Sequence, residues 1–448
     1  MFSTSDTIVA IATPQGRGGI GVVRISGPAA LPVGLALSAT THLEPRHATL
    51  VRVGGGAVHD RAIVTYFPNP ASYTGEDVVE ISAHGTPVVL RAIVKGAIEA
   101  GARLAEPGEF TLRAFLHGRM DLIQAEAVAD LIEAVTPLQV RAAFDQLDGT
   151  LTKQIAAIDE ALFDISTRLE ASLDFPEEGY HFVDPGSVAG EIAAVSSSIK
   201  RLLHDAKRGR LVREGARVAI LGRPNAGKST LFNALAGADR AIVTEIPGTT
   251  RDLVTEVVDV DGMAITLVDT AGMRFAAADA VEAEGTSRAR AAAASADLLL
   301  VVVDGSRPLH DEDRAVLDDT RSRPRVIVVS KADLPAMWNA GDLALQAVAV
   351  APPQGTGLQM LRQMVVEALS SERPAEDTPA VTNLRHVTLL AEACDALLRA
   401  EQSARAAAPE EFVAADVTQA RGYLEEITGR RTADDTLNAI FSRFCIGK

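Results

Sequence analysis

Apolar and polar positions follow three different patterns along the chain. Up to about residue 117, short runs rich in β-branched residues, at 19–25, 62–66 and 78–83, alternate with Gly and Pro turns. Runs of this kind are typical of strands. The stretch 87–100 has helical spacing instead. This mixture predicts an α+β domain at the N-terminus.

A second pattern begins at residue 122, where apolar residues recur at steps of three and four up to residue 173. Leu151, Ile155, Ile158 and Leu162 show this spacing, which is that of amphipathic helices packed in a bundle. Further helical segments are predicted at 188–211, 384–407, 413–427 and 432–444.

A third pattern lies inside the helical one. Short apolar runs alternate with helical stretches, as in a mostly parallel sheet with helices on both faces. An α/β domain inserted into a helical bundle is the simplest organisation, and the helices before and after it should pack together. The predicted strands are 218–221, 254–260, 265–268, 298–303, 326–329 and 347–350.

Composition limits the function classes. The 448 residues suggest about three domains, and 43 basic against 59 acidic residues give a net charge of −16. That charge argues against a protein that coats nucleic acid, because such proteins need a basic surface. Two cysteines cannot form a disulfide framework, which favours a reducing cytosol. The chain has no apolar run long enough to cross a membrane, so a cytoplasmic protein is expected.

The clearest motif is a phosphate-binding loop. Residues 222–229 read GRPNAGKS, between a predicted strand and a predicted helix, which is the context that this motif requires. Its backbone N–H groups can surround a phosphate at the positive end of the helix dipole. Lys228 should reach the β and γ phosphates, and Ser229 should hold Mg²⁺.

Two later segments complete such a site. Residues 269–272 read DTAG after a strand, where Asp269 can hold Mg²⁺ through water and the Gly272 N–H can meet a γ-phosphate. Residues 248–252 read GTTRD in a polar loop. A Thr hydroxyl there can complete the Mg²⁺ shell when the γ-phosphate is present, which makes the loop a switch.

Base choice should come from residues 330–333, which read SKAD. The Asp333 carboxylate can accept two hydrogens from the guanine edge and reject adenine. GTPases usually have Asn where Ser330 stands, so part of the bracing between loops should be missing here. The next loop begins Ala351-Pro352 instead of the usual Ser-Ala. Guanine preference is therefore predicted through Asp333.

Taken together, these motifs identify a family. The sequence resembles the TrmE (MnmE) family of tRNA-modification GTPases over essentially its whole length. The matching segments are DTIVAIATPQGRGGIGVVRISG (6–27), YTGEDVVEISAHG (73–85), EPGEFTLRAFLHGRMDLIQAEAVADLI (106–132), GRPNAGKST (222–230), VTEIPGTTRD (243–252), DTAG (269–272) and FCIGK (444–448). The implied fold is a folate-binding-like α+β domain (1–118), a helical domain (119–211 and 372–448) and an inserted Ras-like P-loop GTPase domain (212–371).

The resemblance also implies K⁺-stimulated hydrolysis, with K⁺ in the place of an arginine finger. It assigns K⁺ to Asn225, Thr244, Ile246 and Thr249, and Mg²⁺ to Ser229 and Thr250. From the sequence alone, Asn225 could equally be an amide that stabilises the loop. The implied GTP-binding residues are Asn225, Ala226, Gly227, Lys228, Ser229, Thr230, Thr244, Glu245, Ile246, Pro247, Gly248, Thr249, Thr250, Asp269, Thr270, Ala271, Gly272, Lys331 and Asp333.

Catalysis in the family depends on a Glu in a Val-Glu-x-x-Gly pattern, which this chain has at 281–285. By this resemblance Glu282 orients the attacking water. One extra residue precedes this pattern, so Glu284 is the alternative. Cys445 matches a residue that the family needs for tRNA modification. It could also be a packed C-terminal thiol, since a nucleophile needs a lowered pKa.

The family's first domain dimerises and binds a tetrahydrofolate derivative, in the 5-formyl or methylene form. The matching positions are Arg24, Glu80, Arg119 and Lys448. Cations suit the glutamate tail of folate, and Glu80 suits the donor edge of the pterin ring. The family usually has Lys in place of Arg119, which keeps the charge but not the geometry.

These resemblances imply a homodimeric, K⁺-dependent GTPase. It would act with the flavoprotein MnmG (GidA), in a heterotetramer, to add an aminomethyl or carboxymethylaminomethyl group at C5 of wobble uridine U34. The tRNA would be held largely by the partner. The alternative is a regulatory GTPase, such as a ribosome-assembly factor, in which hydrolysis is only a timer. A timer needs no folate site, so residues 1–132 and the C-terminal tail distinguish the two.

Overall fold

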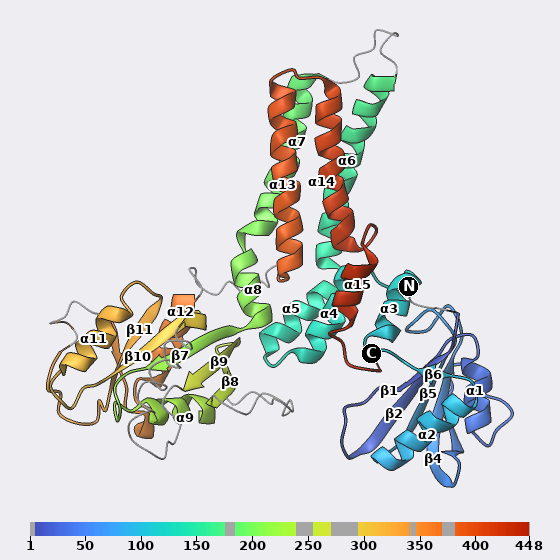
Figure 1. Cartoon of the computed structure of the whole chain (residues 1–448), viewed down its shortest axis with the longest axis horizontal. Helices are drawn as coiled ribbons and strands as arrows, with labels where there is room; N and C mark the ends of the chain where they lie inside the picture. The colour runs from blue at the N-terminus through green and yellow to red at the C-terminus, as the bar shows by residue number, and fades with distance from the viewer. Residues whose placement is uncertain are drawn as a thin grey trace. The chain divides into compact units, whose positions relative to one another are not determined.

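The computed structural model describes residues 5–174, 184–238, 254–269, 294–339, 341, 346–369 and 381–447 (Figure 1). The chain forms two compact units. The first contains Met1–Ala129, Leu147–Ile192 and Asp395–Lys448, and the second contains Asp130–Gln146 and Ala193–Cys394. Each unit is therefore built from segments that are far apart in the sequence.

The first unit contains a six-stranded sheet in the order β3-β4-β5-β2-β1-β6. All pairs are antiparallel except β1 with β6. Helices α1 and α2 pack on the sheet (Figure 1). The elements are β1 (Ile8–Ile11), β2 (Gly18–Ser26), α1 (Ala30–Leu37), β3 (Thr49–Gly55), β4 (Val58–Phe67), β5 (Val78–Gly85), α2 (Pro87–Glu99), β6 (Arg103–Leu104) and α3 (Glu109–Leu116).

Alternation along the central strands places charged residues on the face away from this core. Val23 and Ile25 of β2, and Val79 and Ile81 of β5, are fully buried in one cluster with side chains of α2. Because successive side chains of a strand point to opposite faces, Arg24 and Glu80 lie on the other face. They are also directly opposite each other in the β2–β5 register.

The helices of the first unit have the predicted spacing. Every apolar residue that marks the stripe of α6 (Thr150–Asp174), from Leu151 to Leu169, is buried. Helix α14 (Glu410–Thr428) packs along α6 although it follows in the sequence by more than 230 residues (Figure 1). This confirms the prediction that helices before and after the α/β region pack together. Helix α15 (Asp434–Phe441) also belongs to this unit, whereas α4 (Leu122–Glu133) and α13 (Leu384–Arg405) are each divided between the two units.

The C-terminal tail is anchored to the first unit. Phe441 and Phe444 join a buried cluster with Leu112 of α3 and Leu122 of α4. The Gly108 N–H donates to the Cys445 carbonyl at 3.4 Å, and Ile446 forms a β-bridge with Pro107. These contacts hold the backbone around Cys445 in place.

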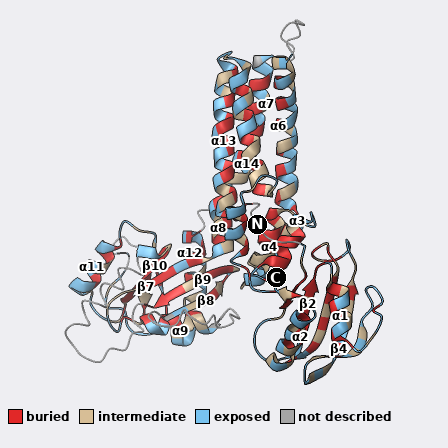
Figure 2. Ribbon diagram, turned by 45° about the vertical axis from the view of Figure 1, so that its right-hand side comes forward, coloured by how far each residue is buried: buried red, intermediate tan, exposed pale blue. Residues whose placement is uncertain are grey.

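The second unit contains a six-stranded sheet in the order β12-β11-β10-β7-β9-β8, parallel except for β8 with β9. Its central strand β10 is buried along almost its whole length (Figure 2), as expected for a sheet covered on both faces. Helix α7 (Pro185–His204) is divided between the two units after residue 192. The other elements are α5 (Pro137–Leu147), α8 (Ala206–Glu214), β7 (Ala216–Leu221), α9 (Lys228–Ala238), β8 (Val254–Val260), β9 (Met263–Asp269), β10 (Leu298–Asp304), α11 (Asp311–Asp319), β11 (Arg325–Ser330), β12 (Ala347–Ala349) and α12 (Leu358–Leu369).

All six predicted strands of the second unit are present, and the α+β and α/β classes are confirmed. The segments without a clear periodic signal were missed. Helix α1 is almost entirely apolar, whereas α11 is mostly acidic and has only Asp313 and Leu317 buried. Neither sequence has the stripe that a half-buried helix shows. Among the described residues, no helix is both long and apolar enough to cross a bilayer.

Candidate functional site: the phosphate-binding loop

The loop after β7 begins with a backbone conformation that only glycine can adopt there. Gly222 has a φ of 146°, and a Cβ atom there would lie 2.2 Å from the Val302 carbonyl oxygen of β10. Gly227, at the other end of the loop, has a φ of 98°. Between them Asn225 adopts a left-handed backbone with a φ of 62° and is exposed. The loop thus turns tightly over the carboxyl end of the central strands and leads into α9.

Lys228, the first residue of α9, is 7% exposed. Its ammonium donates to the carbonyls of Gly222, at 2.8 Å, and Arg223, at 2.7 Å. Burial lowers the pKa of Lys228, and the negative charge of Asp269 opposes part of this shift. A buried ammonium whose hydrogen-bond partners are neutral carbonyls favours an added anion. A phosphate group would supply that charge.

Ser229 and Asp269 come together as predicted for a magnesium site. The Ser229 hydroxyl donates to Asp269 Oδ2 at 3.2 Å. Asp269 ends β9 and is 2% exposed. A hydroxyl and a carboxylate at this separation are hard oxygen donors of the kind that Mg²⁺ prefers. The residues present therefore fit the ion that the motif implies.

The loop after β11 contacts the phosphate-binding loop through Ser330. This residue is 2% exposed, and its hydroxyl hydrogen-bonds to the carbonyl of Ala226 at 2.5 Å and of Val303 at 3.3 Å. The sequence had suggested that Ser330 leaves part of the bracing missing. The hydroxyl nevertheless connects the two loops, because Gly227 has no side chain to keep β11 away.

The predicted base-recognition residues lie beside this contact. The Lys331 ammonium donates to Asp304 Oδ2 at 2.6 Å. Burial would raise the pKa of Asp304, but hydrogen bonds from Lys331 and Ser306 outweigh it and lower the pKa. Asp333 is exposed and accepts a hydrogen bond from Gln354 at 3.3 Å. Gln354 belongs to the short helix Pro352–Gln354, so the loop that starts at Ala351 lies next to Asp333.

The folate candidates in the first unit form a charged pair over aromatic rings. Arg24 and Glu80 lie 2.8 Å apart and are each partly exposed. The Arg24 guanidinium lies over the rings of Tyr73, at 5.2 Å, and Phe110, at 5.7 Å. Such contacts stabilise a cation. The sequence did not identify either ring, because they come from a loop and from α3.

For the other predicted residues, the structure shows only whether they are exposed, or does not describe them. Arg119 is exposed, and so is Thr230 at the start of α9. Cys445 is exposed, whereas Cys394 is buried and lies 3.5 Å from the Ser196 hydroxyl. The predicted residues that lie outside the described part of the chain are Thr244, Glu245, Ile246, Pro247, Gly248, Thr249, Thr250, Thr270, Ala271, Gly272, Glu282, Glu284 and Lys448.

Two charged clusters were missed by the sequence. Arg223 pairs with Glu312 at 3.0 Å and Asp313 at 3.1 Å, which ties the phosphate-binding loop to α11. In the first unit, Arg113 is 1% exposed and its guanidinium contacts carboxylates of Asp6, Glu76 and Glu109. The only available signal was the i, i+4 spacing of Glu109 and Arg113. That spacing is common on exposed helices and does not indicate burial.

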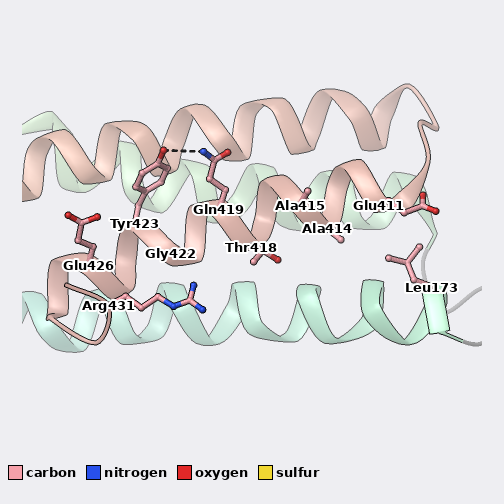
Figure 3. Close-up of a pocket in the computed structure, with 10 residues that line it drawn as sticks. All are labelled: Leu173, Glu411, Ala414, Ala415, Thr418, Gln419, Gly422, Tyr423, Glu426 and Arg431. Carbon is pink, nitrogen blue, oxygen red and sulfur yellow. Dashed lines mark hydrogen bonds between the residues drawn. The ribbon is translucent and has the colours of Figure 1, made fainter. Parts of the chain in front are cut away.

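A groove of about 740 Å³ runs along α14 on the side of α6 (Figure 3). Its floor is a row of small residues, and Gln419 donates to the Tyr423 hydroxyl at 3.1 Å. None of the residues of the phosphate-binding loop lines it. The residues that do are Leu173, Glu411, Ala414, Ala415, Thr418, Gln419, Gly422, Tyr423, Glu426 and Arg431.

Comparison with known proteins agrees with these motifs. Residues 7–119 match the model described as the GTP-binding protein TrmE N-terminus, and residues 122–445 match the MnmE helical domain. The tRNA modification GTPase MnmE of Koribacter versatilis is 43% identical over 455 residues, which cover 100% of both chains. The chain belongs to the MnmE family of tRNA modification GTPases.

A second relative and a solved structure also match parts or all of the chain. MnmE of Chloroflexus aurantiacus is 44% identical over 99% of this chain and 100% of its own. Among solved structures, the G domain of the T. maritima FeoB iron transporter is 26% identical over 35% of this chain and 99% of that chain, with a TM-score of 0.27. The sequence match to MnmE proteins therefore includes both units.

Proposed function

We propose that this GTP hydrolase of the MnmE family drives modification of the wobble uridine U34 of certain tRNAs. The observation that carries the proposal is the arrangement of Lys228, Ser229 and Asp269 at one end of the second sheet. Lys228 would bind the β and γ phosphates, and Ser229 with Thr250 would hold Mg²⁺. The bound Mg²⁺ would neutralise charge that develops on the phosphates. Asp333 and Lys331 would select guanine.

The catalytic aid would be K⁺ instead of an arginine finger. Asn225 would supply its side-chain amide, and Thr244, Ile246 and Thr249 would complete the shell. Glu282, or Glu284, would orient the attacking water. The exposure of Asn225 on the phosphate-binding loop supports this assignment. GTPase rates should be higher in KCl than in NaCl, and Asn225→Ala should remove the difference. Equal rates in the two salts would overturn the cation proposal.

A tetrahydrofolate derivative, in the 5-formyl or methylene form, would bind at Arg24 and Glu80 and supply the one-carbon unit when bound. The charged pair and its aromatic neighbours fit such a ligand, because folate has both an acidic tail and a flat ring with donors. Arg119 and Lys448 would add positive charge for the tail. Calorimetric titration of the intact protein with 5-formyltetrahydrofolate tests this site.

The active assembly would be a homodimer that works with the flavoprotein MnmG (GidA), in a heterotetramer, to attach an aminomethyl or carboxymethylaminomethyl group at C5 of U34. Cys445, exposed on the anchored tail, would take part in the modification. The match of residues 7–119 to the TrmE N-terminus supports this role over that of a timer GTPase.

Nucleoside analysis of tRNA from cells that lack this protein tests the function as a whole. We expect the C5-modified wobble uridine to disappear, to return with the wild-type gene, and to stay absent with Lys228→Ala. An unchanged nucleoside profile in the deletion strain would favour the timer role instead.

A further inference from the structure

Positive charge is concentrated in one short part of this acidic chain. Between residues 200 and 213 there are six Lys and Arg residues and only one acidic residue, Asp205. The segment covers the last turn of α7 and nearly all of α8, and lies wholly in the second unit. A local excess of this kind is the electrostatic signature of a polyanion-binding surface.

Part of this charge is used inside the protein. Arg213 pairs with Asp130 at 2.7 Å, and Arg210 lies 3.5 Å from Glu214 and 3.7 Å from Asp297. These arginines therefore hold α8 against its neighbours. They are not available to an external partner.

Four basic residues of this segment face solvent. Lys200, Arg201, His204 and Lys207 are all exposed, and we call these four residues the basic stripe. Lys200 and His204 are four positions apart on α7, so they lie on one face, one helical turn apart. Lys207 follows in the first turn of α8. The opposite side of the two helices is buried through Ile199 and Val212.

The Lys and Arg residues of the basic stripe differ from several other exposed cations in their partners, whereas His204 lies 3.3 Å from the Asp205 carboxylate. On other helices, several exposed cations pair with carboxylates, as Lys95 does with Glu99 and Arg405 with Glu401. Arg201 has no carboxylate partner in the described part of the chain. Its guanidinium donates instead to the neutral hydroxyl of Ser198 at 2.9 Å. Its charge is therefore not compensated by that contact.

The backbone that carries the stripe is closely packed. Gly209 of α8 lies against the chain at Val381, where a Cβ atom would come within 1.9 Å of the Val381 carbonyl oxygen. The Gly209 N–H also donates to the Asp205 carbonyl at 2.8 Å. A cationic surface on a fixed backbone loses less conformational entropy on binding than one on a loop.

We propose that the basic stripe binds the phosphate backbone of tRNA. The proposal rests on the proposed function, which makes tRNA the polyanion that this protein meets. A membrane surface is a poorer match, because an interfacial helix needs an apolar face next to its cations and here that face is buried. Since the chain as a whole carries −16, repulsion elsewhere would direct the RNA to this position.

The test is tRNA binding by the intact protein, measured by fluorescence anisotropy at several KCl concentrations. The variant K200E/R201E/K207E is compared with the control K95E/K153E/R405E, which changes the net charge equally on exposed helix positions elsewhere. Three lost phosphate contacts should reduce the slope of log K against log[salt] by about 2 to 3 and weaken binding roughly tenfold or more near 0.1 M salt. The control should lose far less.

GTPase activity separates misfolding from loss of binding, because no stripe residue belongs to the nucleotide site. We expect the variant to hydrolyse GTP at the wild-type rate. Equal tRNA affinity and salt dependence in the variant and wild type would overturn the proposal, and so would an equal loss in the control. If tRNA binding by the variant is unchanged but wobble-uridine modification fails in cells, the basic stripe binds an acidic protein instead of tRNA. Failure of the wild-type gene to restore modification would count against the proposed function, not the stripe.

Discussion

The two candidate sites are built on opposite kinds of sheet. In the second unit, Lys228, Asp269 and Ser330 follow or end β7, β9 and β11, parallel strands whose carboxyl ends lie along one edge of the sheet. In the first unit, Arg24 and Glu80 lie opposite each other within two antiparallel strands, on the face away from the main core. In the parallel sheet, the order of the strands therefore decides which residues come together at the carboxyl edge. In the antiparallel sheet, the register of two strands decides which residues face each other.

The two sites also differ in how their cations are compensated. The ammonium of Lys228 donates to two neutral carbonyls. An anionic ligand would therefore supply the negative charge that these hydrogen-bond partners lack. The guanidinium of Arg24 already has a carboxylate 2.8 Å away. A ligand at Arg24 must share it with Glu80, so its charge should contribute less to binding there than that of Lys228 does.

The largest effect should come from Arg113, which lies on α3, the helix that also carries Phe110 beside Arg24. Replacing it with Met leaves the buried carboxylates of Glu76 and Glu109 with less compensation. Breaking a buried ion pair in this way costs about 3–5 kcal/mol. Urea unfolding of the first unit should show this loss, whereas GTP binding by the second unit should persist. Arg168→Met, at a half-exposed pair with Glu191, should cost about 1 kcal/mol or less.

The same network predicts a pH dependence. Burial would raise the pKa of Asp6 and of Glu109, but hydrogen bonds from Arg103 and Arg113 outweigh it and lower both. Their contribution to stability is therefore present above the ordinary values of 3.8 and 4.5, and is lost as the pH falls below them. The free energy of unfolding of the first unit should drop below about pH 4.5. This loss of stability at low pH should be smaller in the Arg113→Met variant. An equal loss in the variant and the wild type would show that groups other than Asp6 and Glu109 cause it.

The second largest effect should come from Lys228. Lys228→Ala should lower the GTPase rate about 10²–10³-fold, because one preorganised donor to the transition state is removed. Single-turnover hydrolysis and binding of a fluorescent GTP analogue would separate the chemical step from affinity. Lys153→Ala, at an exposed position of α6, is the matched control and should hydrolyse GTP at the wild-type rate. A rate for Lys228→Ala within threefold of wild type would contradict the assignment.

This contrast explains what the sequence could predict. The position of the loop between a strand and a helix was predicted, because a single stretch of eight residues, 222–229, contains its glycines, its Lys and its Ser. Gly222 is required at its position by the nearby Val302 carbonyl. The strands of the second unit were also predicted, since strands buried on both faces are continuous apolar runs.

The charged network of the first unit could not be predicted. Asp6, Glu76 and Arg113 are separated by dozens of residues and meet only through the strand register and the position of α3. The same is true of Tyr73 and Phe110 beside Arg24. Nothing in the local pattern distinguishes Arg113 from an exposed cation of an amphipathic helix. Burial of a charge is a property of the tertiary fold, which one sequence does not reveal.

A smaller effect is expected at Arg24. Arg24→Met keeps most of the packing on Tyr73 and Phe110 but removes the charge. Affinity for 5-formyltetrahydrofolate should fall about tenfold to a hundredfold, the range for a charged hydrogen bond of 1.5–3 kcal/mol. GTP hydrolysis should not change. Arg24→Lys, which keeps the charge without the planar fork, should lie between the two. Titration calorimetry of the intact variants measures the difference, and wild-type affinity in Arg24→Met would place the folate elsewhere.

The smallest effect should come from Ser330, where the two loops of the second unit meet. Ser330→Ala removes the hydrogen bonds to the carbonyls of Ala226 and Val303, but fits the same space beside Gly227. One neutral hydrogen bond contributes about 0.5–1.5 kcal/mol, so GDP affinity should fall roughly twofold to tenfold. The maximal GTPase rate should hardly change, because Lys228 is untouched. Stopped-flow nucleotide binding measures the GDP affinity.

Because the hydroxyl acts through the backbone of the phosphate-binding loop, GDP and ADP affinities should fall together. A selective loss of GDP would show that Ser330 acts on the base and not on the loop.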